Sequence, residues 1–184
     1  MSTLKIIKYG HPVLREKARD VKKLGSRERD LIAAMAETMY EARGIGLAAP
    51  QVGICERLFV VDVDQDEEIG PSSRRLRVFI NPEIIWESQE DEPFKEGCLS
   101  IPGVEAEVYR PSRIKVVARD ENFEPFELEA GELLARVIQH EFDHLEGILF
   151  VDRVAASRRA ALAGQLNKIK RATLEDLRAA GLAI

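Results

Sequence analysis

Cysteine and histidine are scarce in this sequence of 184 residues, and that scarcity narrows the kinds of protein it can be. The only cysteines are Cys55 and Cys98, and the only histidines are His11, His140 and His144. Two cysteines cannot build the disulfide framework of a small secreted domain. The positions of these five residues therefore become the main question.

Long apolar runs and targeting signals are lacking as well. No segment approaches the roughly 20 consecutive apolar residues that a membrane-spanning helix needs. The first residues, MSTLKIIKYGHPVLRE, show neither an apolar signal core nor an Arg/Ser-rich transit pattern. With 45% hydrophobic and 32% charged residues, the composition is that of a globular protein. We expect a soluble, cytoplasmic protein that does not enter a membrane.

The overall charge is mildly acidic, since 27 basic and 32 acidic residues give 27 − 32 = −5. Such a balance does not favour DNA as a partner. The average conceals a split, because residues 153–171 carry six basic side chains and no acidic one. The rest of the chain therefore sums to −5 − 6 = −11.

Apolar spacing predicts strands and helices without βαβ alternation, which is typical of an α+β fold. Ser26 is expected to cap a helix that ends near Gly44. Residues 131–146 have the clearest helical pattern, and Gly147 is placed to end it. We also expect strands over 57–63, 77–80, 84–87 (after a break at Asn81-Pro82), 104–109, 113–119 and 123–129, loops over 44–53 and 64–75, a helix over 155–171, and a last short helix opened by a capping box at 173–176.

A metal-binding pattern lies inside the best predicted helix. His140-Glu141-Phe142-Asp143-His144 is an HExxH motif, whose two histidines lie one helical turn apart on the same face. This spacing lets two imidazoles reach one ion, while Glu141 can meet a metal-bound water as a general base. Asp143, at the third position after His140, lies off the line of the two histidines and is expected to be structural.

A catalytic site needs a third protein ligand. A downstream histidine, as in HExxHxxGxxH, is excluded because the last position is Phe150. A downstream glutamate is a second possibility. Glu175, which follows a basic tract near the C-terminus, would as the third ligand indicate a zinc endopeptidase. Cys98, in the turn-like segment 96–100, would supply a thiolate. Cys55 and His11 are expected to be structural. A non-catalytic alternative, a structural metal site closed by four protein ligands, would need one of them as the fourth ligand.

Three segments in this order resemble the motifs of the peptide deformylase family. They are GIGLAAPQ at 44–51, EGCLS at 96–100 and HEFDH at 140–144, which match GxGLAAxQ, EGCLS and HExDH. The resemblance spans about residues 4–153. It predicts a catalytic metallohydrolase domain over 1–153 and a C-terminal helical extension over 154–184.

The resemblance implies an α+β fold with mixed or antiparallel sheets around a central HExxH-bearing helix, followed by a C-terminal helix. It implies removal of the N-formyl group from formylmethionine at the start of nascent polypeptides, with release of formate. One divalent ion would be held by Cys98, His140 and His144. In this family the ion is usually Fe²⁺, and Zn²⁺, Ni²⁺ or Co²⁺ can replace it.

Further roles follow from the same resemblance. Glu141 would be the general acid/base, and the Gln51 side-chain amide and the Leu99 backbone N–H would stabilise the oxyanion. Gly46 backbone groups would pair with the peptide substrate as an added strand. Glu96 and Arg110 resemble a family ion pair that would hold the segment around Cys98.

Selectivity for methionine needs an apolar slot, for which Ile45, Leu133 and Val137 are candidates. Leu133 and Val137 precede His140 by seven and three residues, so both can lie near the metal on the same helix. Plain core packing is the alternative for each of them. Arg136 stands where the family often has an apolar residue, although its aliphatic stem could cover the slot.

The basic tract allows two interpretations. By resemblance to bacterial deformylases, a C-terminal helix carrying it could touch ribosomal RNA. The alternative is a solvated helix face whose apolar stripe, Leu162, Leu166 and Ile169, packs on the domain.

Overall fold

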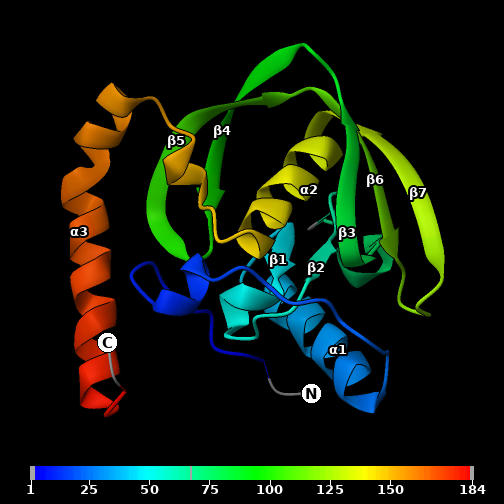
Figure 1. The fold of residues 1–184 in the computed structure, drawn as a ribbon, viewed down its shortest axis with the longest axis horizontal. Coiled ribbons are helices and arrows are strands. Elements are labelled where there is room, and N and C mark those ends of the chain that lie inside the picture. The colour runs from blue at the N-terminus through cyan, green and yellow to red at the C-terminus, as the bar shows by residue number, and fades with distance from the viewer. Residues whose placement is uncertain (1–2, 67, 183–184) are drawn as a thin grey trace.

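Two antiparallel sheets and three α-helices make up the computed structural model, which describes residues 3–66 and 68–182 (Figure 1). Helix α2, Glu132–Leu145, lies between the two sheets. The larger sheet has the order β1-β2-β3-β6-β7, and the smaller one pairs β4 with β5. The strands are β1 Gly46–Ala48, β2 Leu58–Val61, β3 Arg77–Glu87, β4 Asp91–Cys98, β5 Ile101–Pro111, β6 Arg113–Arg119 and β7 Pro125–Gly131. The predicted α+β class with a central helix and a C-terminal helix is confirmed.

Helix α2 is held because its apolar face is buried against the larger sheet. Val137, Ile138 and Leu145 belong to one apolar cluster with Phe59 and Phe79 of that sheet. Gly147 ends the helix in a left-handed conformation (φ +71°), and a Cβ there would lie 2.6 Å from the Arg15 carbonyl oxygen. The predicted stop at this glycine is therefore confirmed, and packing requires it as much as conformation does.

Strand β3 corrects the prediction of two short strands broken at Asn81-Pro82. The strand runs through this position with an irregular register against β6 between Ile80 and Glu83. Asn81 adopts φ +50°, and its side chain accepts from the Val21 N–H and donates to the Val21 carbonyl, both at 2.9 Å. The irregularity is thus pinned by side-chain hydrogen bonds and does not end the strand.

Two strands near the functional motifs were not predicted. β4 is almost entirely exposed, so it has no apolar alternation to reveal it. β1 lies inside the expected loop 44–53, which also contains a short 3₁₀ turn, Ala49–Val52. β1 has only three residues, all buried, and it forms one edge of the larger sheet.

The other two helices also differ in detail from expectation. Helix α1, Ser26–Glu41, begins after Gly25 and not after a capping Ser26; the Gly25 N–H donates to Glu28 Oε2 at 2.7 Å. Helix α3, Ala156–Ala179, runs through the predicted capping box at 173–176. Thr173 Oγ1 donates back to the Ile169 carbonyl at 3.1 Å, so this hydroxyl serves the continuing helix instead of starting a new one.

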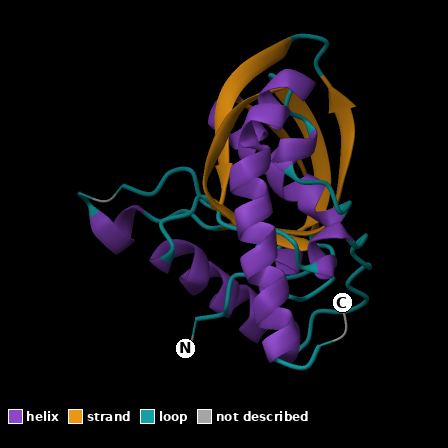
Figure 2. Ribbon diagram, turned by 90° about the vertical axis from the view of Figure 1, so that its left-hand side faces the viewer, coloured by secondary structure: helices purple, strands orange, loops and turns teal. Residues whose placement is uncertain are grey.

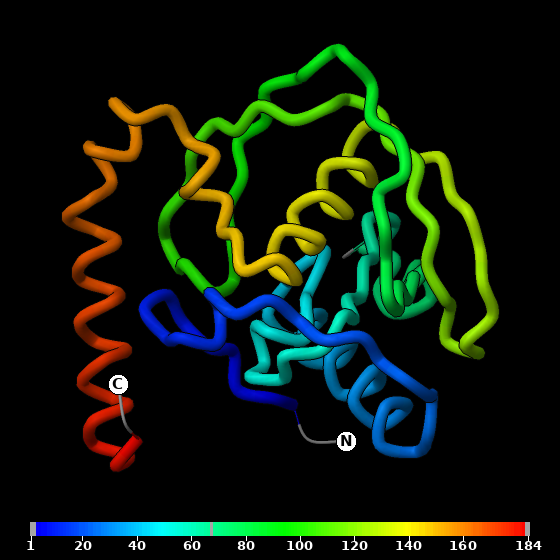
Figure 3. Tube along the Cα trace, viewed as in Figure 1, coloured from blue at the N-terminus to red at the C-terminus, as the bar shows by residue number. Residues whose placement is uncertain are grey.

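Helix α3 stands beside the smaller sheet, next to β5 (Figures 1 and 2). Its predicted stripe is confirmed, because Leu166 is buried and Leu162 and Ile169 pack against the same apolar cluster. The N-terminal segment reaches this helix as well (Figure 3). A Cβ on Gly10 would lie 2.9 Å from Lys170 Cγ. Within the described ranges, none of the helices is long and apolar enough to cross a membrane.

Candidate metal centre and active site

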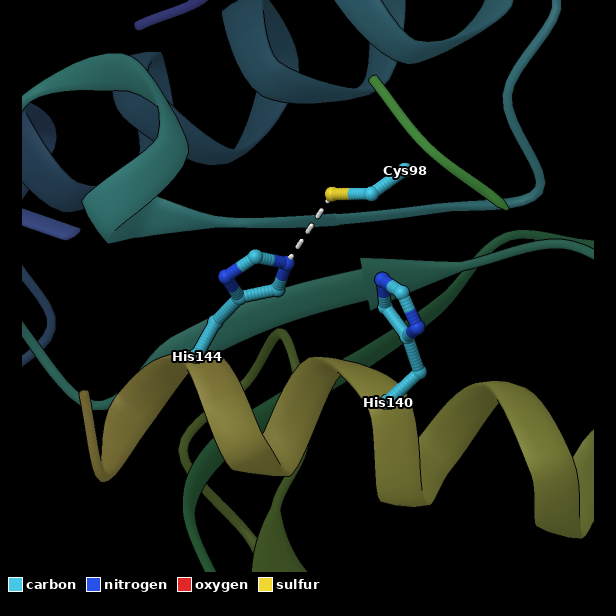
Figure 4. Close-up of side chains that lie close together, drawn as sticks. All are labelled: Cys98, His140 and His144. Atoms are coloured by element: carbon cyan, nitrogen blue, oxygen red, sulfur yellow. Dashed lines mark hydrogen bonds between the residues drawn. The ribbon is translucent and has the colours of Figure 1, made fainter. Parts of the chain in front are cut away.

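The last residue of β4 and one face of α2 bring three metal-ligating side chains together. The ligand atoms of Cys98, His140 and His144 all lie within 4.8 Å of one another (Figure 4). Cys98 Sγ and His144 Nε2 are 3.4 Å apart. Tetrahedral bonds of about 2.3 Å to sulfur and about 2.1 Å to nitrogen would place such atoms about 3.6 Å apart. One thiolate and two imidazoles at this spacing fit a divalent transition-metal ion.

A buried carboxylate orients the first histidine. Glu96 Oε2 lies 3.0 Å from His140 Nδ1, and Arg110 Nε donates to Glu96 Oε1 at 2.7 Å. Burial raises the pKa of Glu96, but the hydrogen bonds to His140 and Arg110 outweigh it and lower the pKa to about 2. An ionised Glu96 fixes a proton on Nδ1 and leaves Nε2 of His140 as the free ligand atom.

The same network extends to the end of the helix. Arg110 also donates to Asp143 Oδ2 at 2.7 Å, and Arg153 makes two bonds of 2.6 Å with the Asp143 carboxylate. Asp143 is 4% exposed, and its carboxylate is engaged in these ion pairs. The expectation that Asp143 is structural is confirmed, as is the Glu96–Arg110 pair.

The environment keeps His144 in the form that binds a metal. Burial lowers the pKa of His144 well below its ordinary value. The imidazole therefore stays neutral, as coordination requires. The Nδ1 atom of His144 is buried without a hydrogen-bond partner in the part of the chain described.

Glu141 follows the first histidine and is almost completely enclosed. It is 4% exposed, and its Oε2 has no hydrogen-bond partner among the described residues. Burial raises the pKa of Glu141 to about 7. A carboxyl group with a pKa near neutrality can both take up and release a proton. Glu141 also lines a cavity of about 810 Å³ that reaches His140 and Cys98.

Two hydrogen-bond donors lie beside Cys98. Gln51 is fixed through its Oε1, which accepts from the Ala48 N–H at 2.9 Å, and its Nε2 lies 3.2 Å from Ser100 Oγ and 3.4 Å from Cys98 Sγ. Leu99 lies in the turn that joins β4 to β5, and among the described residues its backbone N–H has no acceptor. Both residues line the cavity.

The candidate substrate residues line this cavity too, but to different degrees. Val137 is buried, Leu133 is half-buried, and Ile45 is 36% exposed at the rim. Gly46 lies opposite Glu141, where a Cβ would come within 2.5 Å of Glu141 Oε1. The structure thus brings the predicted ligands, the acid/base candidate and the pocket candidates to one place.

Arg136 has a larger role than covering a slot with its stem. Its guanidinium is 3.1 Å from Glu96 Oε1 and donates to the carbonyl oxygens of Val108 at 3.1 Å and Glu92 at 2.5 Å. It also lies over the ring of Phe94. Arg136 therefore ties the smaller sheet to α2, a contact that sequence spacing did not reveal.

Sequence reasoning also missed Lys8 and Ser100. Lys8 Nζ donates to the Leu99 carbonyl at 2.7 Å, and buried Ser100 accepts from Gln51. The position of Ser100 in the EGCLS segment was an available signal. Lys8 carried none, since it is 91 positions from Leu99 in sequence.

The residues expected to stand apart from the centre do so. Nδ1 of His11 accepts from the Val13 N–H at 3.1 Å, and Cys55 packs against apolar clusters. Glu175 is exposed on α3 and lines a different cavity, so it does not join the two histidines as the endopeptidase hypothesis requires.

A three-ligand centre for a divalent ion, beside a buried carboxyl group that can exchange a proton, defines a metal-dependent hydrolase. The sequence profile of the family described as polypeptide deformylase matches residues 3–160. The chain belongs to this family. Its members remove the N-formyl group from nascent peptides and use a single divalent metal ion.

Individual relatives are similar in sequence to this chain over most of their length. The protein named Peptide deformylase 1 of Burkholderia multivorans is 46% identical over 172 residues, which cover 94% of this chain and 92% of the relative. The peptide deformylase of Clostridium botulinum is 52% identical over 153 residues, 83% of this chain and 97% of the relative.

Solved structures show the same fold. A plant peptide deformylase has a TM-score of 0.88 at 37% identity, covering 99% of this chain and 95% of the plant protein. A peptide deformylase from Legionella pneumophila has a TM-score of 0.83 at 38% identity, covering 94% of this chain and 98% of that one.

Proposed function

We propose that Cys98, His140 and His144 hold one divalent ion and that Glu141 is the acid/base group of the deformylation reaction. The observation that carries this assignment is the convergence of the three ligand atoms within 4.8 Å, with the Glu141 side chain in the same cavity. A divalent ion held there would supply Lewis acidity for activating water and polarising the formyl oxygen. The other tasks fall to side chains and backbone groups of the chain.

Glu141 would take a proton from the attacking water at a carboxylate oxygen and deliver it to the leaving amide nitrogen. Gln51 Nε2 and the Leu99 N–H would donate to the formyl oxygen as negative charge develops on it. Loss of one such donor typically costs about 3 kcal/mol of barrier. The fixed orientation of Gln51 supports this role, because no reorganisation is then needed during the reaction.

The peptide substrate would add a strand to the free edge of β1, where Gly46 offers its backbone groups. Main-chain pairing of this kind accepts many sequences, as an enzyme acting on different nascent chains must. Ile45, Leu133 and Val137 would surround the methionine side chain.

The ion in the cell is proposed to be Fe²⁺. Zn²⁺, Ni²⁺ or Co²⁺ would occupy the same Cys/His₂ set in purified protein. Because intrinsic affinity favours these ions over Fe²⁺, metal supply and not the donor set would decide the occupant.

We also propose that the enzyme works in the cytoplasm, with catalysis in residues 1–153 and a helical extension over 154–184 that docks on the ribosome. Exposed basic residues of α3, including Arg158, Arg159 and Arg171, support an electrostatic contact with RNA. Co-sedimentation with ribosomes should weaken as salt rises. Absence of co-sedimentation, or binding insensitive to salt, would exclude this contact.

Formate release from a formyl-methionyl tripeptide, by anaerobically purified protein of known metal content, tests the assignment. Glu141→Gln should keep the metal and lose turnover by at least about a hundredfold. Cys98→Ala should lose metal and activity together, whereas the matched control Cys55→Ala should keep both. Full activity in Glu141→Gln would overturn the role of Glu141, and full metal content in Cys98→Ala would overturn that of Cys98.

A further inference from the structure

A second cavity adjoins the active-site cavity and leads to the C-terminal helix. It has a volume of about 490 Å³ and lies between the start of β5 and α3. Lys8, Pro102, Gly103 and Val104 line both cavities. The two cavities are therefore neighbouring parts of one groove, which passes the tip of the β4–β5 hairpin.

The far wall of this groove is one stripe of α3. Gln165, Lys168, Ala172 and Asp176 recur at helical spacing, and Ile169 and Thr173 lie beside them. The wall is held in place because Leu166 of the same helix is buried in a cluster with Ile101 and Val104 of β5. Helix and strand thus form a groove fixed by core packing.

The chemistry of the groove suits an extended peptide. Ile169, Val104 and Pro102 provide apolar surface, and Gln165 and Thr173 provide polar groups. Its charged side chains are Lys8, Lys168 and Asp176. Lys8 is committed to the Leu99 carbonyl, whereas Lys168 and Asp176 are both exposed and have no ion-pair partner in the part of the chain described. The unpaired cation of Lys168 favours an acidic side chain of the peptide at the position beside it.

We propose that the groove between β5 and α3 is a distal subsite for the formylated peptide, which binds residues downstream of those held at the metal centre and prefers an acidic side chain beside Lys168. The inference rests on the proposed function, because the peptide is placed there by continuity with the active-site cavity. The helix would then serve substrate binding through one face and leave the opposite face for other contacts.

Formyl-methionyl peptides of three, six and nine residues test the subsite, with Glu or Lys placed in turn at each downstream position. The readout is kcat/KM for the long peptide divided by kcat/KM for the three-residue peptide, measured with the metal-loaded enzyme and without ribosomes. Dividing by each variant's own short substrate removes effects on the metal centre. We expect the ratio to reach about fivefold for a peptide carrying Glu at the favoured position.

Two variants should abolish this gain for different reasons. Ala172→Trp fills the groove and should bring the ratio close to one for all long peptides. Lys168→Glu should lose the gain for the Glu peptide and transfer it to the Lys peptide, which a merely structural effect would not do. Arg178→Glu carries the same charge change on another face of α3 and is the matched control.

The outcomes separate the two proposals. If the wild-type enzyme releases formate from the short peptide but the ratio stays at one, the distal subsite is wrong and the proposed function stands. A gain that survives both Ala172→Trp and Lys168→Glu also overturns the subsite. If no peptide of any length releases formate at full metal occupancy, the proposed function itself fails.

Discussion

Glu96 links several residues around the candidate metal centre through one buried carboxylate. Its carboxylate contacts His140, Arg110 and Arg136 while remaining 4% exposed. The resemblance of short motifs indicated the pairing with Arg110. The contact with Arg136 was beyond sequence reasoning, because an arginine on a helix face does not show whether its guanidinium turns outward or into a buried pair.

Replacing Gly46 should displace the Glu141 carboxylate without changing its chemical identity. In Gly46→Ala the new Cβ would meet Glu141 Oε1 at 2.5 Å and Val137 Cγ1 at 2.8 Å, so the carboxylate must move. We expect kcat to fall about a hundredfold, since a displacement near 1 Å commonly has that effect. Metal content should stay unchanged, because no metal ligand is touched.

Steady-state formate release and metal analysis of Gly46→Ala check this expectation. Gly164→Ala is the control, since a Cβ there has nothing within 4 Å and only improves the helix propensity of α3. Equal kcat in the two variants would show that Glu141 tolerates displacement.

Strong periodicity made some secondary-structure elements predictable and its absence hid others. The helix expected over 131–146 is α2, and the strand expected over 113–119 is β6 with the same bounds. β4 was missed because its side chains are mostly exposed, and it is a strand only through its pairing with β5. Cys98 at its end was predicted as a ligand through the resemblance of the EGCLS motif, whereas the strand that positions it had no apolar signal.

Helix α3 should contribute to stability as well as to contacts. Leu166 is 5% exposed within the cluster that includes Ile101 and Val104. Leu166→Ala is expected to lower the free energy of unfolding by about 3 kcal/mol through lost burial and the cavity left behind.

Urea unfolding followed by circular dichroism measures this loss. Leu182→Ala removes a leucine that is 56% exposed and should change stability by less than about 0.5 kcal/mol. Similar urea midpoints for Leu166→Ala and the unmodified protein would contradict a contribution of this contact of α3 to stability.

Asp152 connects three parts of the chain that are distant in sequence or belong to different elements. Its carboxylate pairs with Arg15 of the N-terminal 3₁₀ turn, Pro12–Arg15, and lies 3.4 Å from Arg159 of α3. It also accepts from the Leu149 N–H at 2.9 Å, just beyond α2. Burial alone would raise the pKa of Asp152, but the hydrogen bonds with Arg15 and Leu149 outweigh burial and hold the pKa below its ordinary value.

Because the pKa of Asp152 is lower in the folded than in the unfolded protein, ionised Asp152 stabilises the fold at neutral pH. This contribution is complete above the unfolded pKa of about 4 and is lost as pH falls from there through the folded value. In Asp152→Asn the melting temperature should therefore be lower than that of the unmodified protein at pH 7, and the difference should narrow below pH 4.

Glu129→Gln is the control, because Glu129 is an exposed carboxylate paired with Arg113 on the larger sheet. Its melting temperature should depend on pH as that of the unmodified protein does. A constant difference between Asp152→Asn and the unmodified protein from pH 7 to pH 3 would show that the loss comes from packing and not from the charge that joins the N-terminal turn, the end of α2 and α3.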